Sequence, residues 1–266
     1  MVGKTTESST GTSSIVSVSL LMVSKYRDGK QVRLAAATAA KLPPVSDEAR
    51  NAAAAAAAEL VEPGMTIGLG SGRAVWATLA RLPRGTSAVV ASELTRERAL
   101  TAGIEVFELD GSFELDLALD GADEVDGSIG LIKGGGGALL REKIVISAAR
   151  RFVVVAEVAK KVDRLGERFR LPVEVVRFGW RDTRRRLGDL LPDAELRSTE
   201  DGSQPYVTDE GHYILDAHIP SDTEPAALAD ALLRVPGVVD HGLFLDMADL
   251  ALLGRPDGTV ERLERP

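Results

Sequence analysis

Cysteine is absent from the 266-residue chain, so disulfide bonds and thiolate-bound metals are excluded. The three histidines (His212, His218 and His241) lack the HxxH or HExxH spacing of a zinc site. No apolar run approaches the roughly 18 residues that a membrane-spanning helix needs. A net charge of −8 argues against nucleic acid as the principal partner. These absences favour a soluble metabolic enzyme, with no metal, nucleic-acid or membrane partner expected.

Composition separates residues 1–44 from the rest. They are rich in serine and threonine and contain only two acids, Glu7 and Asp28. We predict a disordered N-terminal extension there and a cytoplasmic protein. An organellar transit peptide is the alternative, because such peptides are rich in serine and poor in acids. The remaining length is enough for one large domain or two modest ones.

After Ser46, which is placed to cap a helix rich in alanine, strands and helices alternate. The predicted order is 65–69 (strand), 73–82 (helix), 88–91 (strand), 93–102 (helix) and 104–107 (strand). This repetition predicts an α/β fold with an open, mostly parallel, Rossmann-like sheet flanked by helices.

A different order of elements begins near residue 168. Its strands and helices are predicted at 171–176 (strand), 181–190 (helix), 194–197 (strand), 212–219 (strand), 224–234 (helix) and 237–244 (strand). This β-α-β-β-α-β order is ferredoxin-like. We therefore predict a small α+β domain at 168–240, and a catalytic α/β domain made of 45–167 plus 241–266.

The segment from Leu115 to Lys143 has the most unusual composition. Alternating leucines predict a mostly buried strand that stops at Asp120, and ligands of open α/β sheets lie beyond the carboxyl ends of the strands. After a hairpin-like loop come Lys133 and the four glycines of Gly134–Gly137. Glycines are costly to order, so they indicate close approach of backbone N–H groups to a small polar ligand.

The helix that follows these glycines carries Glu142. Leu139, Val145 and Ile146 lie on the same side of this helix, within about 60° of the glutamate. A carboxylate in such apolar surroundings is expected to have a raised pKa, which suits proton abstraction near neutral pH.

A second glycine-rich segment, Gly68–Gly72, lies between the first predicted strand and its helix. Such a turn is a candidate phosphate site, but neither register completes a dinucleotide fingerprint and no P-loop GK[ST] is present. From these residues alone, a tight strand-to-helix turn is an equally good interpretation. Ser92 likewise has two possible roles, as the cap of the following helix or as a residue that binds a ligand.

The sequences DGADEVD (120–126) and KGGGGALLREK (133–143) together resemble the ribose-5-phosphate isomerase family of the A type. The resemblance continues through LPVEVV, YILD and VPGVVDHGLF, and covers about residues 46–260 in order. It implies an aldose–ketose isomerase that interconverts ribose 5-phosphate and ribulose 5-phosphate through an enediol, without metal or other cofactor. It also implies a homodimer or homotetramer.

The resemblance assigns roles to individual residues. Glu142 aligns with the proton acceptor, Asp120 and Asp123 with residues that contact sugar hydroxyls and assist ring opening, and Lys133 with the loop that binds the reacting oxygen. The catalytic residues are thus expected to be Glu142, Asp120 and Lys133. The substrate-binding residues are expected to be Ser71, Gly72, Arg73, Ala74, Asp120, Gly121, Ala122, Asp123, Lys133, Gly134, Gly135, Gly136 and Lys160.

The chain departs from the family pattern at two places. The usual loop G-x-G-T-G-S-T has Ser71, Arg73 and Ala74 at its three hydroxyl positions, so one hydroxyl is kept. Arg73 could replace the lost hydrogen bonds to phosphate or point to solvent. The usual D-x-S-K sequence has Glu157 and Ala159 in place of the aspartate and serine, and keeps Lys160.

Three alternatives stay open. A sugar-phosphate-binding regulator could share the fold without catalysis, although no DNA-binding helix-turn-helix is evident in residues 1–44. An isomerase-like protein that has lost its activity, or an isomerase for another sugar phosphate, would also fit. His241 is expected to be a packed or surface histidine rather than a base.

Overall fold

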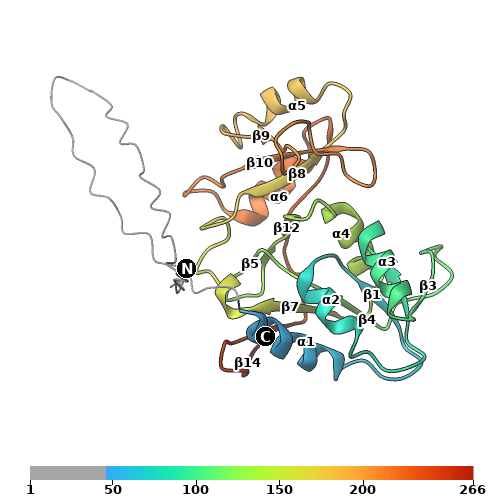
Figure 1. Ribbon diagram of the computed structural model, residues 1–266. Coiled ribbons are helices and arrows are strands. Elements are labelled where there is room, and N and C mark those ends of the chain that lie inside the picture. The colour runs from blue at the N-terminus through green and yellow to red at the C-terminus, as the bar shows by residue number, and fades with distance from the viewer. Residues whose placement is uncertain (1–45, 266) are drawn as a thin grey trace, which may run out of the picture. The chain divides into compact units, whose positions relative to one another are not determined.

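A seven-stranded sheet forms the core of residues 46–265, the part of the chain that the computed structural model describes (Figure 1). The extension predicted at 1–44 lies outside these residues. The strands are β1 (Thr66–Leu69), β2 (Ser87–Val90), β3 (Glu105–Val106), β4 (Leu117–Asp120), β7 (Phe152–Glu157), β13 (Leu250–Gly254) and β14 (Val260–Glu264).

The order of these strands is β14-β13-β7-β4-β1-β2-β3. All neighbours are parallel except β13 and β14, which form an antiparallel hairpin at one edge. The prediction of a mostly parallel, Rossmann-like sheet is confirmed. Strand order changes direction between β1 and β4, and in open α/β sheets such a switch point opens a crevice for ligands.

Four helices flank this sheet: α1 (Asp47–Ala58), α2 (Arg73–Leu79), α3 (Glu93–Thr101) and α4 (Leu139–Ser147). Side chains alternate along a strand, so each strand serves both faces. Leu117 and Leu119 of β4 pack with residues of α1, α2 and α3, whereas Ala118 packs with residues of α4. Asp120 is two residues after Ala118, so its side chain lies on the same face of the strand, the one that α4 covers.

The second sheet has four antiparallel strands in the order β11-β8-β10-β9. Its elements are β8 (Leu171–Val175), α5 (Trp180–Leu187), β9 (Glu195–Leu196), β10 (Tyr213–Ala217), α6 (Pro225–Leu233) and β11 (Val238–His241). This is the ferredoxin-like arrangement that the order of elements predicts. The smaller domain that we propose at 168–240 contains this sheet, whose hydrophobic core also takes in Ile132 and Leu243.

A third, three-stranded sheet connects the other two and was not predicted. It consists of β5 (Glu124–Val125), β6 (Leu131–Ile132) and β12 (Leu243–Phe244), in the order β12-β6-β5. The single strand expected at 237–244 is therefore two strands in different sheets. The chain changes sheets at Gly242, where an added Cβ would lie 2.3 Å from the carbonyl oxygen of Lys133. Only glycine lets these two backbones come so close.

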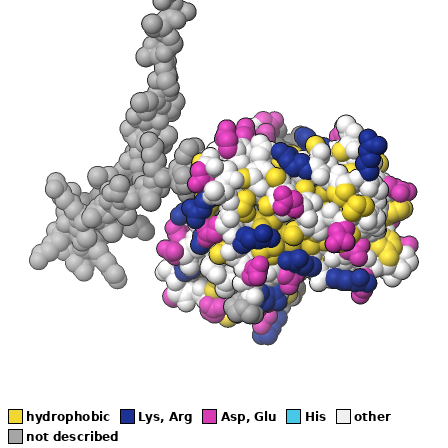
Figure 2. All heavy atoms as spheres, turned by 90° about the horizontal axis from the view of Figure 1, so that it is seen from below, with side chains coloured by type: hydrophobic (Ala, Val, Ile, Leu, Met, Phe, Trp, Pro, Cys, Tyr) yellow, Lys and Arg dark blue, Asp and Glu magenta, His cyan; other side chains and the backbone are white. Residues whose placement is uncertain are grey.

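Charged side chains of both signs alternate over the face shown in Figure 2, and hydrophobic side chains gather in a band among them. The net negative charge is thus not concentrated in a patch of one sign on that face. Within residues 46–265, no helix is long and apolar enough to cross a membrane.

Candidate active site

A cavity of about 230 Å³ opens beyond the carboxyl ends of β1 and β4, at the switch point of the sheet. The turn after β1, the turn after β4 and the glycine loop before α4 contribute most of its walls. The lining residues are Ser71, Gly72, Arg73, Ala74, Trp76, Gly121, Ala122, Asp123, Lys133, Gly134, Gly135, Gly136, Glu142, Glu157 and Lys160. The structure thus brings together every residue expected from the sequence, with Asp120 directly behind this wall. Trp76 and Glu157 were missed.

Lys133 lies at the end of β6 and makes three polar contacts. Its Nζ is 2.8 Å from Asp120 Oδ2 and 3.1 Å from Glu142 Oε2, and it donates a hydrogen bond of 2.7 Å to the carbonyl oxygen of Gly121. All three charged side chains are at most 5% exposed. Two carboxylates therefore share a single buried cation.

The pKa values reflect this imbalance. Burial raises the pKa of Glu142 to about 8, and the nearby negative charge of Asp120 adds to the effect. Burial also raises the pKa of Asp120, but Lys133 and the backbone N–H of Gly121 favour its charged form. Burial works against the charge of Lys133, yet the two carboxylates outweigh it and raise the lysine's pKa. Asp120 has the shorter contact with Lys133, and the raised pKa of Glu142 agrees with the expectation from its apolar surroundings.

Gly70 makes room for Asp120. A Cβ at this position would lie 1.8 to 2.3 Å from the three carboxyl-group atoms of Asp120. Gly70 N also donates to the carbonyl oxygen of Leu119 at 2.9 Å, which ties the turn after β1 to the end of β4. The glycine is thus required by close packing against a catalytic candidate.

The glycine loop brings a second carboxylate into the cavity wall. Asp123 Oδ2 accepts a hydrogen bond of 2.8 Å from the N–H of Gly135. Gly134 and Gly137 have φ values of +100° and +84°, which L side chains rarely adopt. Glycine is therefore required at 134 and 137 by the backbone conformation. It is required at 135 by lack of space, because an added Cβ would lie 2.8 Å from Asp123.

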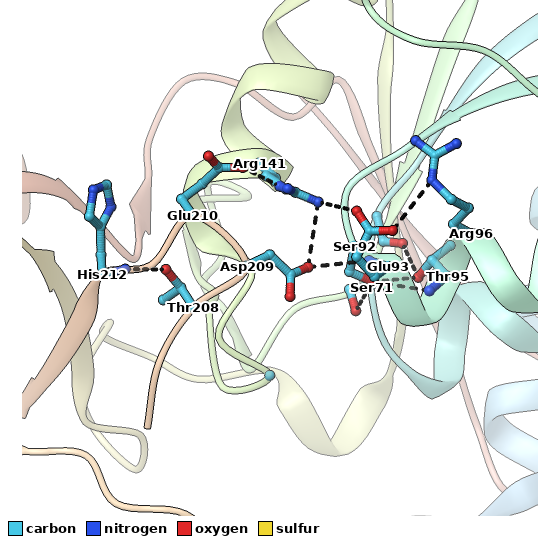
Figure 3. Close-up of polar contacts among 12 residues, drawn as sticks. Ser71, Ser92, Glu93, Thr95, Arg96, Arg141, Thr208, Asp209, Glu210 and His212 are labelled. Atoms are coloured by element: carbon cyan, nitrogen blue, oxygen red, sulfur yellow. Dashed lines mark hydrogen bonds and ion pairs between the residues drawn. The ribbon is translucent and has the colours of Figure 1, made fainter. Parts of the chain in front are cut away.

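The turn after β1 is tied to α3 through hydroxyl groups (Figure 3). Ser92 Oγ accepts from the N–H of Thr95 at 3.1 Å, so Ser92 caps α3. The same oxygen donates to Ser71 Oγ at 3.0 Å, and Thr95 Oγ1 donates to the carbonyl oxygen of Gly70 at 3.0 Å. Ser92 is thus a helix cap that also holds the turn carrying Ser71.

On the opposite wall, Lys160 ends a short 3₁₀ turn (Val158–Lys160) that follows β7. Glu157, the last residue of β7, is buried and its Oε1 accepts a hydrogen bond of 3.1 Å from Nε of Arg50 in α1. Arg73 is exposed at the first position of α2, across the cavity. Besides Lys133, two cationic side chains, Arg73 and Lys160, thus line this cavity.

Other acids of the same segment are structural. Glu124 accepts three backbone N–H groups, from Gly166, Arg168 and Phe169, at 2.6 to 2.7 Å. Asp126 accepts the N–H of Gly130 at 2.8 Å and thereby closes the β5–β6 hairpin. The acid-rich sequence therefore divides into two site residues and two that hold loops.

His241 is packed, as expected. It is buried in β11, and burial together with the charge of Lys143 lowers its pKa to about 4. Its Nδ1 accepts the N–H of Leu243 at 3.2 Å. Among residues 46–265, no group of three or more histidine, aspartate or glutamate side chains is placed to hold a metal ion.

A buried carboxyl group with a raised pKa, beside an ammonium and facing a polar cavity, defines a site for acid–base chemistry on a small polar molecule. Residues 87–258 match the sequence profile of the family described as ribose 5-phosphate isomerase A (phosphoriboisomerase A). The chain belongs to the ribose 5-phosphate isomerase A family.

Individual relatives are similar in sequence over most of the chain. It is 52% identical over 226 residues to ribose-5-phosphate isomerase A of Roseiflexus castenholzii, covering 82% of this chain and 95% of the relative. The corresponding protein of a Synechococcus strain is 48% identical over 228 residues, covering 83% and 98%.

Solved structures show the same fold. Ribose 5-phosphate isomerase A of Methanocaldococcus jannaschii is 33% identical, with a TM-score of 0.77, covering 82% of this chain and 99% of that chain. A D-ribose-5-phosphate isomerase in complex with phospho-erythronic acid is also 33% identical, with a TM-score of 0.78, covering 84% and 100%.

Proposed function

We propose that this chain interconverts D-ribose 5-phosphate and D-ribulose 5-phosphate, a reaction of the non-oxidative branch of the pentose phosphate pathway. Membership of the isomerase family supports the reaction. The observation that carries the proposal is the position of Glu142, a buried carboxyl group whose pKa is raised to about 8 and which lines the cavity beside Lys133.

In this reaction Glu142 acts as the general base. Its carboxylate removes the proton from C2 of the open-chain aldose and returns it to C1, while a second proton passes from the C2 oxygen to the C1 oxygen through an enediol. Negative charge develops on the carbonyl oxygen during the first transfer. We assign the stabilisation of that charge to the Lys133 ammonium and to backbone N–H groups of the glycine loop.

Two aspartates orient the sugar. Asp120 and Asp123 accept hydrogen bonds from substrate hydroxyls, and Asp120 assists ring opening. The carboxylate of Asp120 also sets the proton balance of the site, because its charge is one cause of the raised pKa of Glu142. We assign these roles from the family resemblance together with their location at the end of β4 and in the cavity wall.

The phosphate end of the substrate is bound between the turn after β1 and the end of β7. The turn supplies Ser71, Gly72, Arg73 and Ala74, and the opposite wall supplies Lys160. The two cationic side chains suit a doubly charged phosphate group. A sugar phosphate is thus the proposed small-molecule partner. A homodimer or homotetramer, which the family resemblance implies, and a cytoplasmic location stay proposals.

The test is conversion of ribose 5-phosphate to ribulose 5-phosphate by the purified protein in the presence of EDTA, beside Glu142→Gln. We expect turnover without metal by the wild type. In the variant kcat should fall by at least about 10³-fold, since glutamine keeps the shape of the side chain but cannot accept the proton. Glu62→Gln, at an exposed glutamate outside the cavity, is the matched control. Binding of ribose 5-phosphate without turnover by the wild type would instead indicate a regulator or a different sugar phosphate.

A further inference from the structure

Two side chains outside the cavity hold the glycine loop from its outer side. Arg197, which follows β9, donates from Nη1 to the carbonyl oxygens of Gly134 at 2.8 Å and Gly135 at 3.1 Å. Tyr206 donates from its hydroxyl group to the carbonyl oxygen of Gly136 at 3.1 Å. Three successive carbonyl groups of the loop thus bind side chains that do not line the cavity.

These contacts determine where the loop N–H groups point. In a trans peptide the C=O and the following N–H point in opposite directions, and no cis peptide bond occurs in the described chain. Because Arg197 binds the oxygen of Gly134, the N–H of Gly135 points away from Arg197, toward Asp123. Because Arg197 also binds the oxygen of Gly135, the N–H of Gly136 points away from it as well.

The N–H of Gly136 differs from its neighbours in having no acceptor within residues 46–265. Gly135 donates to Asp123, and Gly137 donates to the carbonyl oxygen of Gly134 at 3.0 Å. Gly136 and Lys133 both line the cavity. The N–H of Gly136 is therefore a donor without a partner in the wall of the cavity, where an oxygen of the substrate can accept it.

Arg197 is itself rigidly held. Its Nε and Nη2 bind the two carboxylate oxygens of Asp216 in β10 at 2.8 and 2.5 Å, a two-pronged arrangement that fixes the plane of the guanidinium. The remaining nitrogen, Nη1, is the one that binds the glycine loop. A lysine at position 197 could keep the positive charge beside Asp216. It lacks the planar guanidinium, however, whose third nitrogen binds the glycine loop in a fixed direction.

Tyr206 is fixed by the segment that follows it. Arg141 of α4 forms ion pairs with Glu93 of α3 and with Glu210, and Asp209 accepts the N–H of Glu93 at 3.2 Å (Figure 3). These contacts attach the 206–211 segment to both helices. The hydroxyl group of Tyr206 lies 2.2 Å from where a Cβ of Gly137 would be, so the tyrosine rests directly on the loop.

We propose that Arg197 and Tyr206 are positioning residues for the isomerisation. Arg197 turns the Gly136 N–H toward the substrate oxygen that gains negative charge, and Tyr206 holds the next peptide group, between Gly136 and Gly137, in place. The inference rests on the proposed function. It assigns a part in catalysis to the segment between β9 and β10, although neither side chain lines the cavity.

The first test is steady-state kinetics of Arg197→Lys and Tyr206→Phe with ribose 5-phosphate. An aimed N–H donor is worth about 10²- to 10³-fold in kcat when removed, so we expect kcat to fall about 10- to 100-fold in Arg197→Lys. We expect about a 3- to 10-fold fall in Tyr206→Phe, where one of the loop's hydrogen bonds is lost. KM should change less than about 3-fold in both, because the donor acts mainly on the transition state.

The controls are Arg170→Lys and Tyr213→Phe. Arg170 directly precedes β8 and Tyr213 lies in β10, and neither side chain forms a hydrogen bond with the glycine loop. A similar fall of kcat in these controls would overturn the proposal, since it would indicate a general effect on the sheet. Tyr206→Phe removes a single oxygen, so it tests the loop contact even if Arg197→Lys fails to fold.

The second test observes the Gly136 amide directly in protein labelled with ¹⁵N-glycine. Phospho-erythronic acid carries a carboxylate that stands in for the negatively charged oxygen. We expect its binding to move the Gly136 amide proton downfield in the wild type, and to move it by less than half as much in Arg197→Lys. An equal shift in both proteins, or unchanged kcat in both variants, would overturn the proposal. A wild type without turnover would overturn the proposed function instead, and the amide measurement would still decide whether Arg197 orients Gly136.

Discussion

The ammonium of Lys133 lies 3.1 Å from Oε2 of Glu142, and both side chains are at most 5% exposed. The same ammonium is 2.8 Å from Asp120, so one cation serves two buried carboxylates. A second negative charge in this space is costly, because burial weakens solvation while like charges repel. The base of the proposed reaction is thus kept partly protonated by its own surroundings.

The raised pKa of Glu142 predicts how activity depends on pH. A general base must be deprotonated, and its pKa of about 8 means that the active fraction rises as pH increases toward that value. We expect log kcat/KM to rise with a slope near 1 below about pH 8 and to level off above it. Measurement of kcat/KM from pH 6 to 9.5 checks this, and a flat profile between pH 6 and 8 would contradict it.

The same pKa predicts that Glu142→Gln changes the pH dependence of stability. The folded protein holds the Glu142 proton up to about pH 8, whereas the unfolded chain releases it near the ordinary value of 4.5. Between these values the folded state binds more protons, so the glutamate makes stability fall as pH rises, by about 1.4 kcal/mol per pH unit at most. Glutamine does not titrate, so this loss of stability with rising pH is absent from Glu142→Gln.

Melting temperatures of the two proteins from pH 5 to 9 measure the effect. The difference between Glu142→Gln and wild type should grow in favour of the variant up to about pH 8 and then stay constant. Glu62→Gln, at an exposed position, should follow the wild type throughout. Parallel curves for wild type and Glu142→Gln would show that the carboxyl group is not forced to hold its proton.

Gly70→Ala should disable the site while leaving most of the fold intact. The added methyl group would lie about 2 Å from the Asp120 carboxyl group, so that group must move away from Lys133. We expect kcat/KM to fall about 10²-fold or more, since displacement of a catalytic group by about 1 Å costs this much. The matched control is Gly127→Ala, where an added Cβ meets nothing within 4 Å. Equal activity of the two variants would show that Asp120 tolerates displacement.

The sequence predicts the sheet and the charged site well, because both rest on local signals. Alternating leucines end at Asp120, and the glycines follow Lys133 within one short segment, so a linear pattern already places these groups together. The ferredoxin-like sheet likewise follows from the order of its elements. The hairpin of β13 and β14 was missed, and its edge strand β14 is half exposed and charged.

Other features depend on contacts between distant parts of the chain. Tyr206 reaches Gly136 across 70 residues, and Arg197 reaches Gly134 across 63, with no periodic pattern to connect them. Asp120 and Glu124 are both carboxylates of the same short segment, and the sequence does not tell their roles apart. Asp120 faces Lys133, whereas Glu124 binds backbone N–H groups. Pairing of strands far apart in sequence decides such roles, so composition alone does not reveal them.

The last prediction concerns Arg73, which stands where the family usually has a hydroxyl group. Arg73 is exposed at the cavity wall, opposite Lys160. If its guanidinium binds the phosphate group, Arg73→Gln should raise KM for ribose 5-phosphate about 5- to 50-fold, since a charged hydrogen bond is worth about 1.5 to 3 kcal/mol, and kcat should change little. The increase should shrink at high salt, which screens an exposed ion pair. Arg81→Gln, at an exposed arginine just beyond the C-terminal end of the same helix, is the control. An unchanged KM in Arg73→Gln would show that this arginine points to solvent and that the phosphate is bound by the turn and Lys160 alone.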